Sequence, residues 1–256
     1  MRRAGLSLAA TTAVTLFALS AAVAPLRAQA IPAAKDLMAK HDAAIGGRAA
    51  LDKYSTMRRV GAMAIPAMGL EASLEMLQEK SGKFLQKIVL GPMGEVQQGF
   101  DGKTAWAVQP GMGPVLLDGD QAKELIAQGD FYGGFHDASK FTSAETVEIA
   151  DFEGRKCYKV KLVRKAGGEG FEYFDVETGL TAGVVRETPD PMNGGKMTTT
   201  QVISDYKDFG GVKMPTKIAT KGGQFDMTLS FTAVEFDKVD VANFALPDAI
   251  KALVKP

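Results

Sequence analysis

From Met57 onward, apolar and polar residues alternate along most of the chain with a period of two. The segment 70–76 is a clear example, in which Leu70, Ala72, Leu74 and Met76 alternate with Glu71, Ser73 and Glu75. Such alternation is typical of a β-strand with one buried and one wet face, because successive side chains point to opposite sides of a sheet. These segments, separated by Gly-rich turns, predict roughly ten strands joined as hairpins.

A helical period precedes the strands. Pro32 suits the first turn of a helix, and Leu37, His41 and Ile45 repeat at i, i+4 and i+8 until Gly46-Gly47 ends the helix. Its apolar stripe is expected to lie against the sheet. We interpret His41 as a packed or hydrogen-bonded residue, because no second His, Cys or carboxylate cluster accompanies it as metal ligands would.

Three shorter helical segments are predicted elsewhere. Residues 48–54 form a second helical piece, and Asp118-x-x-Gln121 is a capping box that predicts a helix through Gln128. Residues 248–254 can form a closing helix. Few helices and many strands, with no repeat and no linker, favour one mainly-β (α+β) domain.

The only tryptophan lies in the hairpin segment Phe100-Asp101-Gly102-Lys103-Thr104-Ala105-Trp106. Asp-Gly between β-prone runs is a strong hairpin signal, because glycine accepts the positive φ of a tight turn. A loop of two or four residues places Trp106 and Val108 on one face with Gln97 and Gly99. A three-residue loop with a bulge places them with Val96 and Gln98, and we favour this version because it gives a more apolar face.

The N-terminal 30 residues have the composition of a secretory signal peptide. Arg2 and Arg3 form a basic start, residues 6–23 form an apolar run, and Ala28 and Ala30 fit the small-x-small cleavage rule. The sequence therefore predicts a signal peptide over residues 1–30 and a mature periplasmic domain over residues 31–256. A membrane anchor is the competing interpretation; the Ala/Thr/Ser-rich run and the cleavage site argue against it.

Charge and cysteine content narrow the class of protein. The chain has 30 basic and 30 acidic residues, and removing Arg2, Arg3 and Arg27 with the predicted signal leaves 27 basic against 30 acidic. A mildly negative chain lacks the electrostatic footprint of a nucleic-acid-binding protein. Cys157 is the only cysteine, so the exported chain is expected to fold around a large core, with no internal disulfide.

The residues that usually carry catalysis are sparse. The sequence contains no H-E-x-x-H, G-x-S-x-G or phosphate-binding glycine motif, and His41 and His136 are its only imidazoles. Four acidic residues lie near the predicted helix that ends at Gln128: Asp118, Asp120, Glu124 and Asp130. We interpret them as a helix cap and a solvent-exposed helix face. A metal site is the less simple interpretation, because they lack an oxygen-rich loop with ligand spacing. We expect no enzyme activity, no metal and no cofactor.

Methionines are abundant in the first half of the chain. They include Met63, Met68, Met76, Met93 and Met112, several of which stand beside glycines. Thioethers on flexible stems fill irregular space and tolerate guests of varied shape, so these residues are interpreted either as core fillers or as the lining of a binding cavity.

Six segments, in order along the chain, resemble the outer-membrane lipoprotein-sorting (LolA-like) family and its secreted relatives. The hairpin at 100–106 is one; the others are Ala44-Ile45-Gly46-Gly47-Arg48, the segment 172–180, Asp205-Tyr206-Lys207, the segment 210–217 and Phe244-Ala245-Leu246-Pro247. The resemblance implies an unclosed antiparallel β-barrel with helices covering an apolar cavity. It also implies a carrier that shields the acyl chains of a lipid or lipoprotein between membranes.

Strand alternation together with the hairpin resemblance gives the predicted cavity lining: Leu74, Met76, Phe84, Ile88, Trp106 and Val108. The aromatic, Gly-containing segment Phe131-Tyr132-Gly133-Gly134-Phe135-His136 is either a loop packed on the core or a mobile lid, with Phe131, Tyr132 and Phe135 as lid residues.

The sequence leaves two questions open. Lipoprotein carriers of the family use a polar anchor in the cavity; Arg58 and Arg59 are adjacent on an early strand, so one of them must point inward if alternation holds. The alternative function is an interaction module without lipid cargo, which docks on an envelope protein through its open sheet edge or the 131–135 segment. A deep apolar cavity favours the carrier, and a filled core with an exposed aromatic patch favours the docking module.

Overall fold

Thirteen antiparallel strands form one sheet in the part of the chain that the computed structural model describes, residues 31–165, 168–189, 195–223 and 225–254. The strands are β1 Thr56–Ile65, β2 Leu70–Glu79, β3 Phe84–Val89, β4 Glu95–Phe100, β5 Ala105–Gln109, β6 Gly113–Leu117, β7 Phe141–Phe152, β8 Arg155–Arg164, β9 Glu169–Asp175, β10 Thr181–Pro189, β11 Lys196–Phe209, β12 Val212–Lys221 and β13 Met227–Phe236. The mainly-β prediction is confirmed, and the estimate of ten strands is too low. The predicted signal peptide and its cleavage residues, Ala28 and Ala30, lie outside the described residues.

Four α-helices accompany the sheet within the described residues: α1 Ala34–Ala44, α2 Arg48–Leu51, α3 Gly119–Gln128 and α4 Asp248–Lys251. All four were predicted, and α2 and α4 are shorter than expected. The prediction of a capping box before α3 is wrong, because the Asp118 side chain makes no capping hydrogen bond. Every strand neighbour is a hairpin partner except the pair β1–β13, which joins the first strand to the last.

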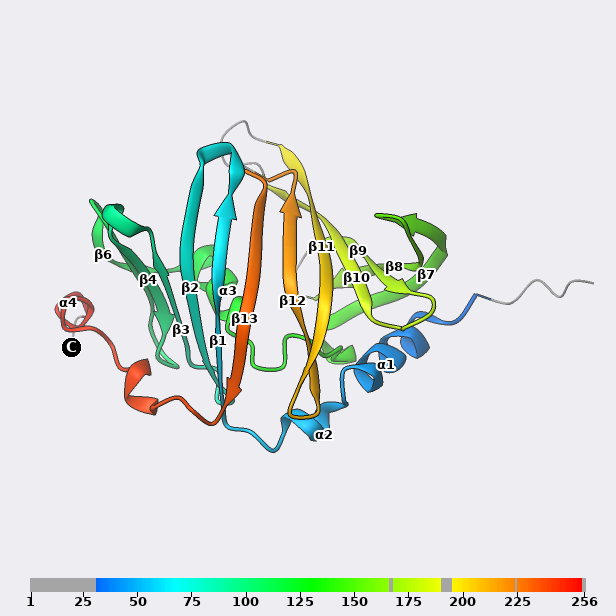
Figure 1. Ribbon diagram of the computed structural model, residues 1–256, viewed down its shortest axis with the longest axis horizontal. Helices are drawn as coiled ribbons and strands as arrows, with labels where there is room; N and C mark the ends of the chain where they lie inside the picture. Colours follow the sequence, from blue (N-terminus) through cyan, green and yellow to red (C-terminus); the bar gives the residue numbers. More distant parts are fainter. Residues whose placement is uncertain (1–30, 166–167, 190–194, 224, 255–256) are drawn as a thin grey trace, which may run out of the picture. The chain divides into compact units, whose positions relative to one another are not determined.

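The strand order leaves the barrel open. The sheet runs β6-β5-β4-β3-β2-β1-β13-β12-β11-β10-β9-β8-β7, so β6 and β7, which are consecutive in the chain, lie at opposite edges. Their connection, residues 118–140, must therefore traverse the width of the sheet. We call it the crossing segment and name the face that it covers the inner face. In Figure 1 its helix, α3, lies behind the strands.

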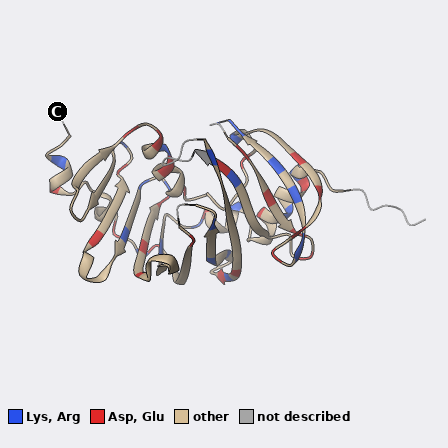
Figure 2. Ribbon diagram, turned by 90° about the horizontal axis from the view of Figure 1, so that it is seen from above, with Lys and Arg blue, Asp and Glu red and all other residues tan. Residues whose placement is uncertain are grey.

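Hydrophobic clusters lie on both faces of the sheet. On the inner face, α1 packs on β8 and β9 through Leu37, Met38 and Phe174, and α3 packs on the β2–β5 region. On the outer face, the C-terminal segment covers Trp106 through Phe244 of η4 (Val241–Phe244) and Ile250 of α4. Basic and acidic positions are interspersed along the ribbon (Figure 2).

The β4–β5 hairpin has a four-residue loop, so the favoured bulged register is wrong. Gly99 pairs with Trp106 and Gln97 pairs with Val108. The Asp101 carboxylate accepts hydrogen bonds from the backbone N–H of Lys103 (2.8 Å) and Thr104 (2.7 Å), which stabilises this longer turn. A Cβ on Gly99 would lie 2.8 Å from Cζ2 of Trp106, so the glycine makes room for the indole ring.

Candidate functional site

An apolar cluster on the inner face is the candidate functional site. Strand alternation brings Leu74 and Met76 of β2 beside Phe84 of β3, and Phe231 of β13 closes the group from the other side of β1. All four side chains are buried. Leu125 of α3 packs into this cluster and is the one buried residue of the helix. The cluster is therefore covered by α3 through a single large side chain.

Four of the six predicted lining residues lie together here. Leu74, Met76, Phe84 and Ile88 belong to this cluster. Trp106 and Val108 lie on the outer face with Leu77 and Leu85, beneath the C-terminal segment. Their placement with the other four was wrong, because the four-residue hairpin loop turns them to the side of Leu77 rather than Met76.

Arg59 is the inward-pointing member of the arginine pair. Its Nη2 lies 3.6 Å from Sδ of Met76, and its guanidinium lies 4.9 Å from the centre of the Phe231 ring. Its Nε is shielded from solvent without a hydrogen-bond partner among the described residues. Burial lowers the pKa of Arg59 to about 10, and no carboxylate offsets that effect.

Arg58 faces the other way. It forms ion pairs with Glu75 of β2 (2.6 Å) and Glu235 of β13 (2.7 Å) on the outer side of the sheet. Hydrogen bonds to these two carboxylates raise the pKa of Arg58. Arg59 is thus a cation without a carboxylate partner among apolar side chains of the inner face. Sequence alone left this position undecided between two arginines.

The aromatic part of the crossing segment is packed on the core. Phe131 and Phe135 are buried against Met57 of β1 and Val212 of β12, together with residues of the α1–α2 region. Tyr132 is half-buried, and the Arg48 guanidinium lies 3.9 Å above its ring. These side chains form no exposed aromatic patch, so the 131–135 segment does not offer the docking surface that the alternative function requires.

His136 ends this aromatic segment and holds it to two other elements. Its Nδ1 lies 2.9 Å from the Asp42 carboxylate of α1, and its Nε2 lies 3.3 Å from the Glu172 carboxylate of β9. Glu172 also accepts a hydrogen bond from the Thr181 hydroxyl at 2.8 Å. We call His136, Asp42, Glu172 and their partners His41 and Thr181 the His136 network.

Electrostatics favour the ionised state of this network. Burial opposes charge on His136, but the hydrogen bonds to Asp42 and Glu172 outweigh it and raise the pKa of the imidazole to about 9. Burial likewise opposes charge on Glu172, but its contacts with His136 and Thr181 lower its pKa to about 2. The network therefore contains a protonated His136 between two carboxylates.

His41 lies beside His136, with ring centres 5.1 Å apart. Burial lowers the pKa of His41, and the neighbouring His136 charge adds to the effect. Its Nδ1 accepts the backbone N–H of Thr181 (3.0 Å), and its Nε2 lies 3.2 Å from the carbonyl oxygen of Gly134. The prediction that His41 is a hydrogen-bonded core residue is confirmed.

His41, Asp42 and His136 are close enough together to hold a metal ion. Every ring nitrogen of the two histidines, however, already has a protein partner, and a protonated imidazole is not a ligand. The same engagement leaves neither histidine free to act as a general base. The arrangement is suited to holding α1, the crossing segment and β9 together.

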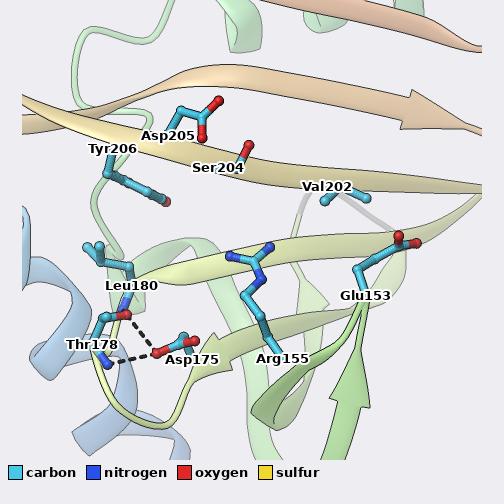
Figure 3. Close-up of a pocket in the computed structure, with 9 residues that line it drawn as sticks. All are labelled: Glu153, Arg155, Asp175, Thr178, Leu180, Val202, Ser204, Asp205 and Tyr206. Atoms are coloured by element: carbon cyan, nitrogen blue, oxygen red, sulfur yellow. Dashed lines mark hydrogen bonds between the residues drawn. The ribbon is translucent and has the colours of Figure 1, made fainter.

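A polar pocket of about 560 Å³ lies on the outer face where β11 separates from β10 (Figure 3). Arg155 bridges the gap by donating to the carbonyl oxygens of Ala182 (2.8 Å) and Ile203 (3.1 Å). Asp175 accepts hydrogen bonds from the backbone and hydroxyl of Thr178. Arg155 and Asp175 are thus hydrogen-bonded within the protein, and the charged lining makes the pocket unsuited to an acyl chain.

Sequence reasoning missed Asp42, Glu172 and Thr181 as members of the His136 network. One signal was present. Glu172 occupies the same alternation phase as Gly170 and Phe174, so a carboxylate stands at a buried position of β9. A charge at such a position requires a partner, but the sequence does not reveal which one.

Comparison with known proteins identifies the fold. No protein-family model and no curated protein matches the chain. A LolA superfamily protein from Nitrosomonas europaea, 12% identical, superposes with a TM-score of 0.55 and covers 84% of this chain and 99% of its own. A structure described as an outer membrane lipoprotein-sorting protein domain, from Vibrio parahaemolyticus, is 12% identical with a TM-score of 0.55, covering 82% and 94%.

A DUF1329 family protein from Desulfovibrio piger is similar to the same degree, with 11% identity, a TM-score of 0.56 and coverage of 82% of this chain and 95% of its own. The chain therefore has the LolA-like fold that its sequence segments resemble. At this identity the likeness establishes architecture, and function must be argued from the site. Within the described residues, no helix combines the length and the apolar character needed to span a bilayer.

Proposed function

We propose that this protein is a non-enzymatic periplasmic carrier that binds the acyl chains of a lipid or lipoprotein on the inner face of its open barrel. The observation that carries the proposal is the apolar cluster around Leu74, Met76 and Phe84. Arg59 lies against this cluster without a counter-ion, and one lightly attached helix covers it. Solved structures with the same fold include one described as a lipoprotein-sorting protein domain, which agrees with this role.

The cargo site becomes available when α3 moves away. Leu125 and the half-buried Ala122 are the side chains by which the helix joins the cluster, and burying one leucine is worth roughly 1.5–3 kcal/mol. An acyl chain gains about 0.8 kcal/mol per buried CH₂, so a few methylenes suffice to replace Leu125. In the closed arrangement α3 occupies the surface that the acyl chain would cover, and a chain of ordinary length can compete with the helix for it.

Arg59 gives the site a chemical preference. A partly buried cation without a counter-ion is unfavourable, and an anionic group next to the acyl chain would neutralise it. The cation lies among Met76 and Phe231, so a ligand that places its chain on these residues brings its polar end to the guanidinium. Carboxylate or phosphate groups are the anions that arginine binds well.

The test is extraction of lipid from protein purified from a membrane-containing host, followed by mass spectrometry. We expect co-purified acyl lipid in the wild type and its loss in Met76→Asp, because a carboxylate at this buried position repels an acyl chain. Ile88→Asp makes the same change at a half-buried position, where the cost to folding is smaller. Thermal unfolding confirms that each variant is folded.

A matched control is Ile126→Asp, since Ile126 is an exposed residue of α3 and does not belong to the inner-face cluster. It should retain lipid. Wild-type protein that carries no lipid and gives no signal with a hydrophobic fluorescent probe would contradict the carrier function. Retention of lipid by both Met76→Asp and Ile88→Asp would contradict the proposed position of the binding site.

A further inference from the structure

Three hairpin loops at one end of the sheet each expose a methionine. They are the connections β1–β2, β3–β4 and β5–β6, which share an end because each follows an odd-numbered strand in a run of consecutive antiparallel hairpins. Met68, Met93 and Met112 are 58%, 57% and 71% exposed. We call these three residues the methionine rim. The β1–β2 connection lies at the top of Figure 1.

This exposure corrects the interpretation of these methionines as core fillers or cavity lining. Met63 and Met76 are buried, but the rim residues project into solvent. Three large, unbranched apolar side chains at the tips of neighbouring loops have no role in the folded core. Exposed apolar side chains that gather at one end of a protein mark a contact with another apolar phase.

The rim loops share one local design. Each methionine is followed by a glycine with positive φ: Gly69 at 58°, Gly94 at 98° and Gly113 at 75°. Proline is present in every loop, and none of the three contains a charged residue: Pro66-Ala67-Met68-Gly69, Gly91-Pro92-Met93-Gly94 and Pro110-Gly111-Met112-Gly113-Pro114. Turn hydrogen bonds use backbone groups internally, as from Gly69 N–H to the Pro66 carbonyl (3.0 Å). Such turns can leave water at little polar cost.

The turns at the opposite end of the same strands are charged. The β2–β3 turn is Lys80-Ser81-Gly82-Lys83, and the β4–β5 turn is Asp101-Gly102-Lys103-Thr104. The two ends of one half of the sheet therefore differ in polarity although they are built from the same strands. This contrast makes the apolar rim a property of one end and not of hairpin loops in general.

A lipid bilayer fits the rim better than a protein partner does. The three side chains stand on separate loops, so each can enter the acyl region by itself, as wedges at a membrane surface do. Glu71 and Glu95, the first charged residues after two of the loops, are exposed and acidic, so the three rim loops as described offer no basic residue to anionic headgroups. Apolar loop tips without basic neighbours therefore match an uncharged bilayer surface.

The rim is also continuous with the inner face. Leu70 begins β2 next to Met68 and has the same alternation phase as Ala72, Leu74 and Met76. An apolar row therefore runs along β2 from the rim to the cluster beneath α3. A bilayer at the rim would meet the sheet at the point where this row begins.

We propose that the methionine rim inserts into the surface of an uncharged lipid bilayer and docks the protein there. The inference goes beyond the carrier function, because docking needs no cargo and a carrier can act without touching a membrane. It assigns a surface and a partner, phosphatidylcholine-like bilayer lipid, to the three loops.

The first test places an environment-sensitive fluorophore on single cysteines introduced by Met68→Cys, Met93→Cys and Met112→Cys. Cys157 is fully buried, so labelling is confined to the introduced thiol. Adding phosphatidylcholine vesicles should shift the emission of all three probes to the blue. Ser81→Cys, in a charged turn at the opposite end, is the matched control and should show no shift.

The second test is vesicle flotation of protein expressed as the full chain, with its N-terminus determined by mass spectrometry. The triple change of Met68, Met93 and Met112 to Ser should weaken binding by roughly tenfold or more, whereas the same positions changed to Leu should retain it. A control triple, Val147→Ser, Ile149→Ser and Val241→Ser, removes exposed apolar residues elsewhere and should retain binding.

Four outcomes with vesicles would overturn the proposal. They are the absence of a probe shift at the rim, an equal shift at Ser81→Cys, unchanged flotation of the serine triple, and flotation that requires phosphatidylglycerol. Self-association at the rim without vesicle binding would also overturn it, and analytical ultracentrifugation detects that case. Each outcome is independent of whether the protein co-purifies with lipid, so failure here leaves the carrier proposal standing.

Discussion

Adjacent residues on a strand can have opposite electrostatic surroundings, as Arg58 and Arg59 of β1 demonstrate. Arg58 lies between Glu75 and Glu235, while Arg59 lies against a thioether and a phenyl ring. An exposed ion pair contributes little to stability, but an unpaired buried cation is unfavourable. A protein that keeps such a cation on an apolar surface gives up stability at that residue, which is common at binding sites.

Replacing the two arginines separately tests this difference. Arg59→Met should raise the free energy of unfolding by about 1–3 kcal/mol, because it removes an unsatisfied buried polar group. Arg58→Met is the matched control and should lower it by roughly 0–1 kcal/mol through the loss of two surface ion pairs. Urea unfolding measures both. A larger destabilisation by Arg59→Met than by Arg58→Met would contradict the assignment of Arg59 as uncompensated.

The same pair tests ligand chemistry. We expect the wild type to bind a fatty acid more tightly than the fatty alcohol of equal chain length, since only the acid neutralises Arg59. Arg59→Met should lose this preference, and Arg58→Met should keep it. Calorimetric titration with the two ligands provides the comparison, and equal binding of acid and alcohol by the wild type would rule out the anionic preference.

Helix α3 is amphipathic but only lightly anchored. Its one buried residue is Leu125, its N-terminal Asp118 makes no side-chain capping hydrogen bond, and Ile126 beside it is exposed. At its C-terminal end, Gly129 lies against Phe84, and a Cβ there would come within 2.5 Å of the Phe84 Cβ. The Gln78 amide donates to the Asp130 carbonyl at 3.2 Å. The helix is therefore fixed mainly at its end and at one central side chain.

Leu125→Ser should release α3 from the sheet. The loss of leucine burial removes roughly 1.5–3 kcal/mol from the local opening free energy of the helix. Hydrogen exchange should accelerate over residues 119–128, with β1 and β13 unchanged, and a hydrophobic probe should bind more strongly. Ile126→Ser is the control in the same helix turn. If both variants exchange like the wild type, Leu125 does not hold the helix.

For the molecule as a whole, the crossing segment is a consequence of topology. Because β6 and β7 are the two free edges, residues 118–140 have to pass over the sheet, and they cover the inner face on the way. The His136 network fixes the far part of this segment to α1 and β9. The far part of the crossing segment is thus held by charges and buried aromatics, while α3 itself buries only one large side chain, Leu125.

The His136 network predicts a pH dependence of folding stability. The folded-state pKa of His136, about 9, lies above its ordinary value of 6.5, so its contribution is complete below pH 6.5 and is lost as the pH rises through 9. His41 acts in the opposite sense: its lowered pKa removes stability as the pH falls below 6.5. We expect stability to decline by a few kcal/mol from pH 6.5 to 9.

Urea unfolding across this pH range, with His136→Gln as the reference, measures the effect. The variant keeps hydrogen-bond donors near Asp42 and Glu172 but has no titrating imidazole, so its stability should change little between pH 6.5 and 9. Parallel pH profiles of the wild type and the variant would assign the decline to other groups.

Local pattern and global arrangement were predictable to different degrees. The α1 stripe, the strands from β1 to β13 and most hairpin neighbours follow from periodicity and turn residues. The resemblance of several turns to LolA-like proteins pointed to an open barrel, and the comparisons agree. The hairpin was predicted at the right place, but Trp106 was assigned to the wrong face of the sheet. One residue of loop length decides the face, and Asp101 stabilises the longer loop.

The sequence by itself determined which residues of one strand or one helix share a face, because side-chain alternation in strands and the helical repeat are local properties of the chain. Only the tertiary structure decided which face is covered, and by what: α3 over Leu74 and Met76, and the C-terminal segment over Trp106. It also decided that Arg59 faces inward and that His136 meets Asp42 and Glu172, which are 94 and 36 positions away. Alternation separates the side chains of a strand into two sets but does not say which set faces a covering element. Contacts between distant segments arise only when the chain has packed.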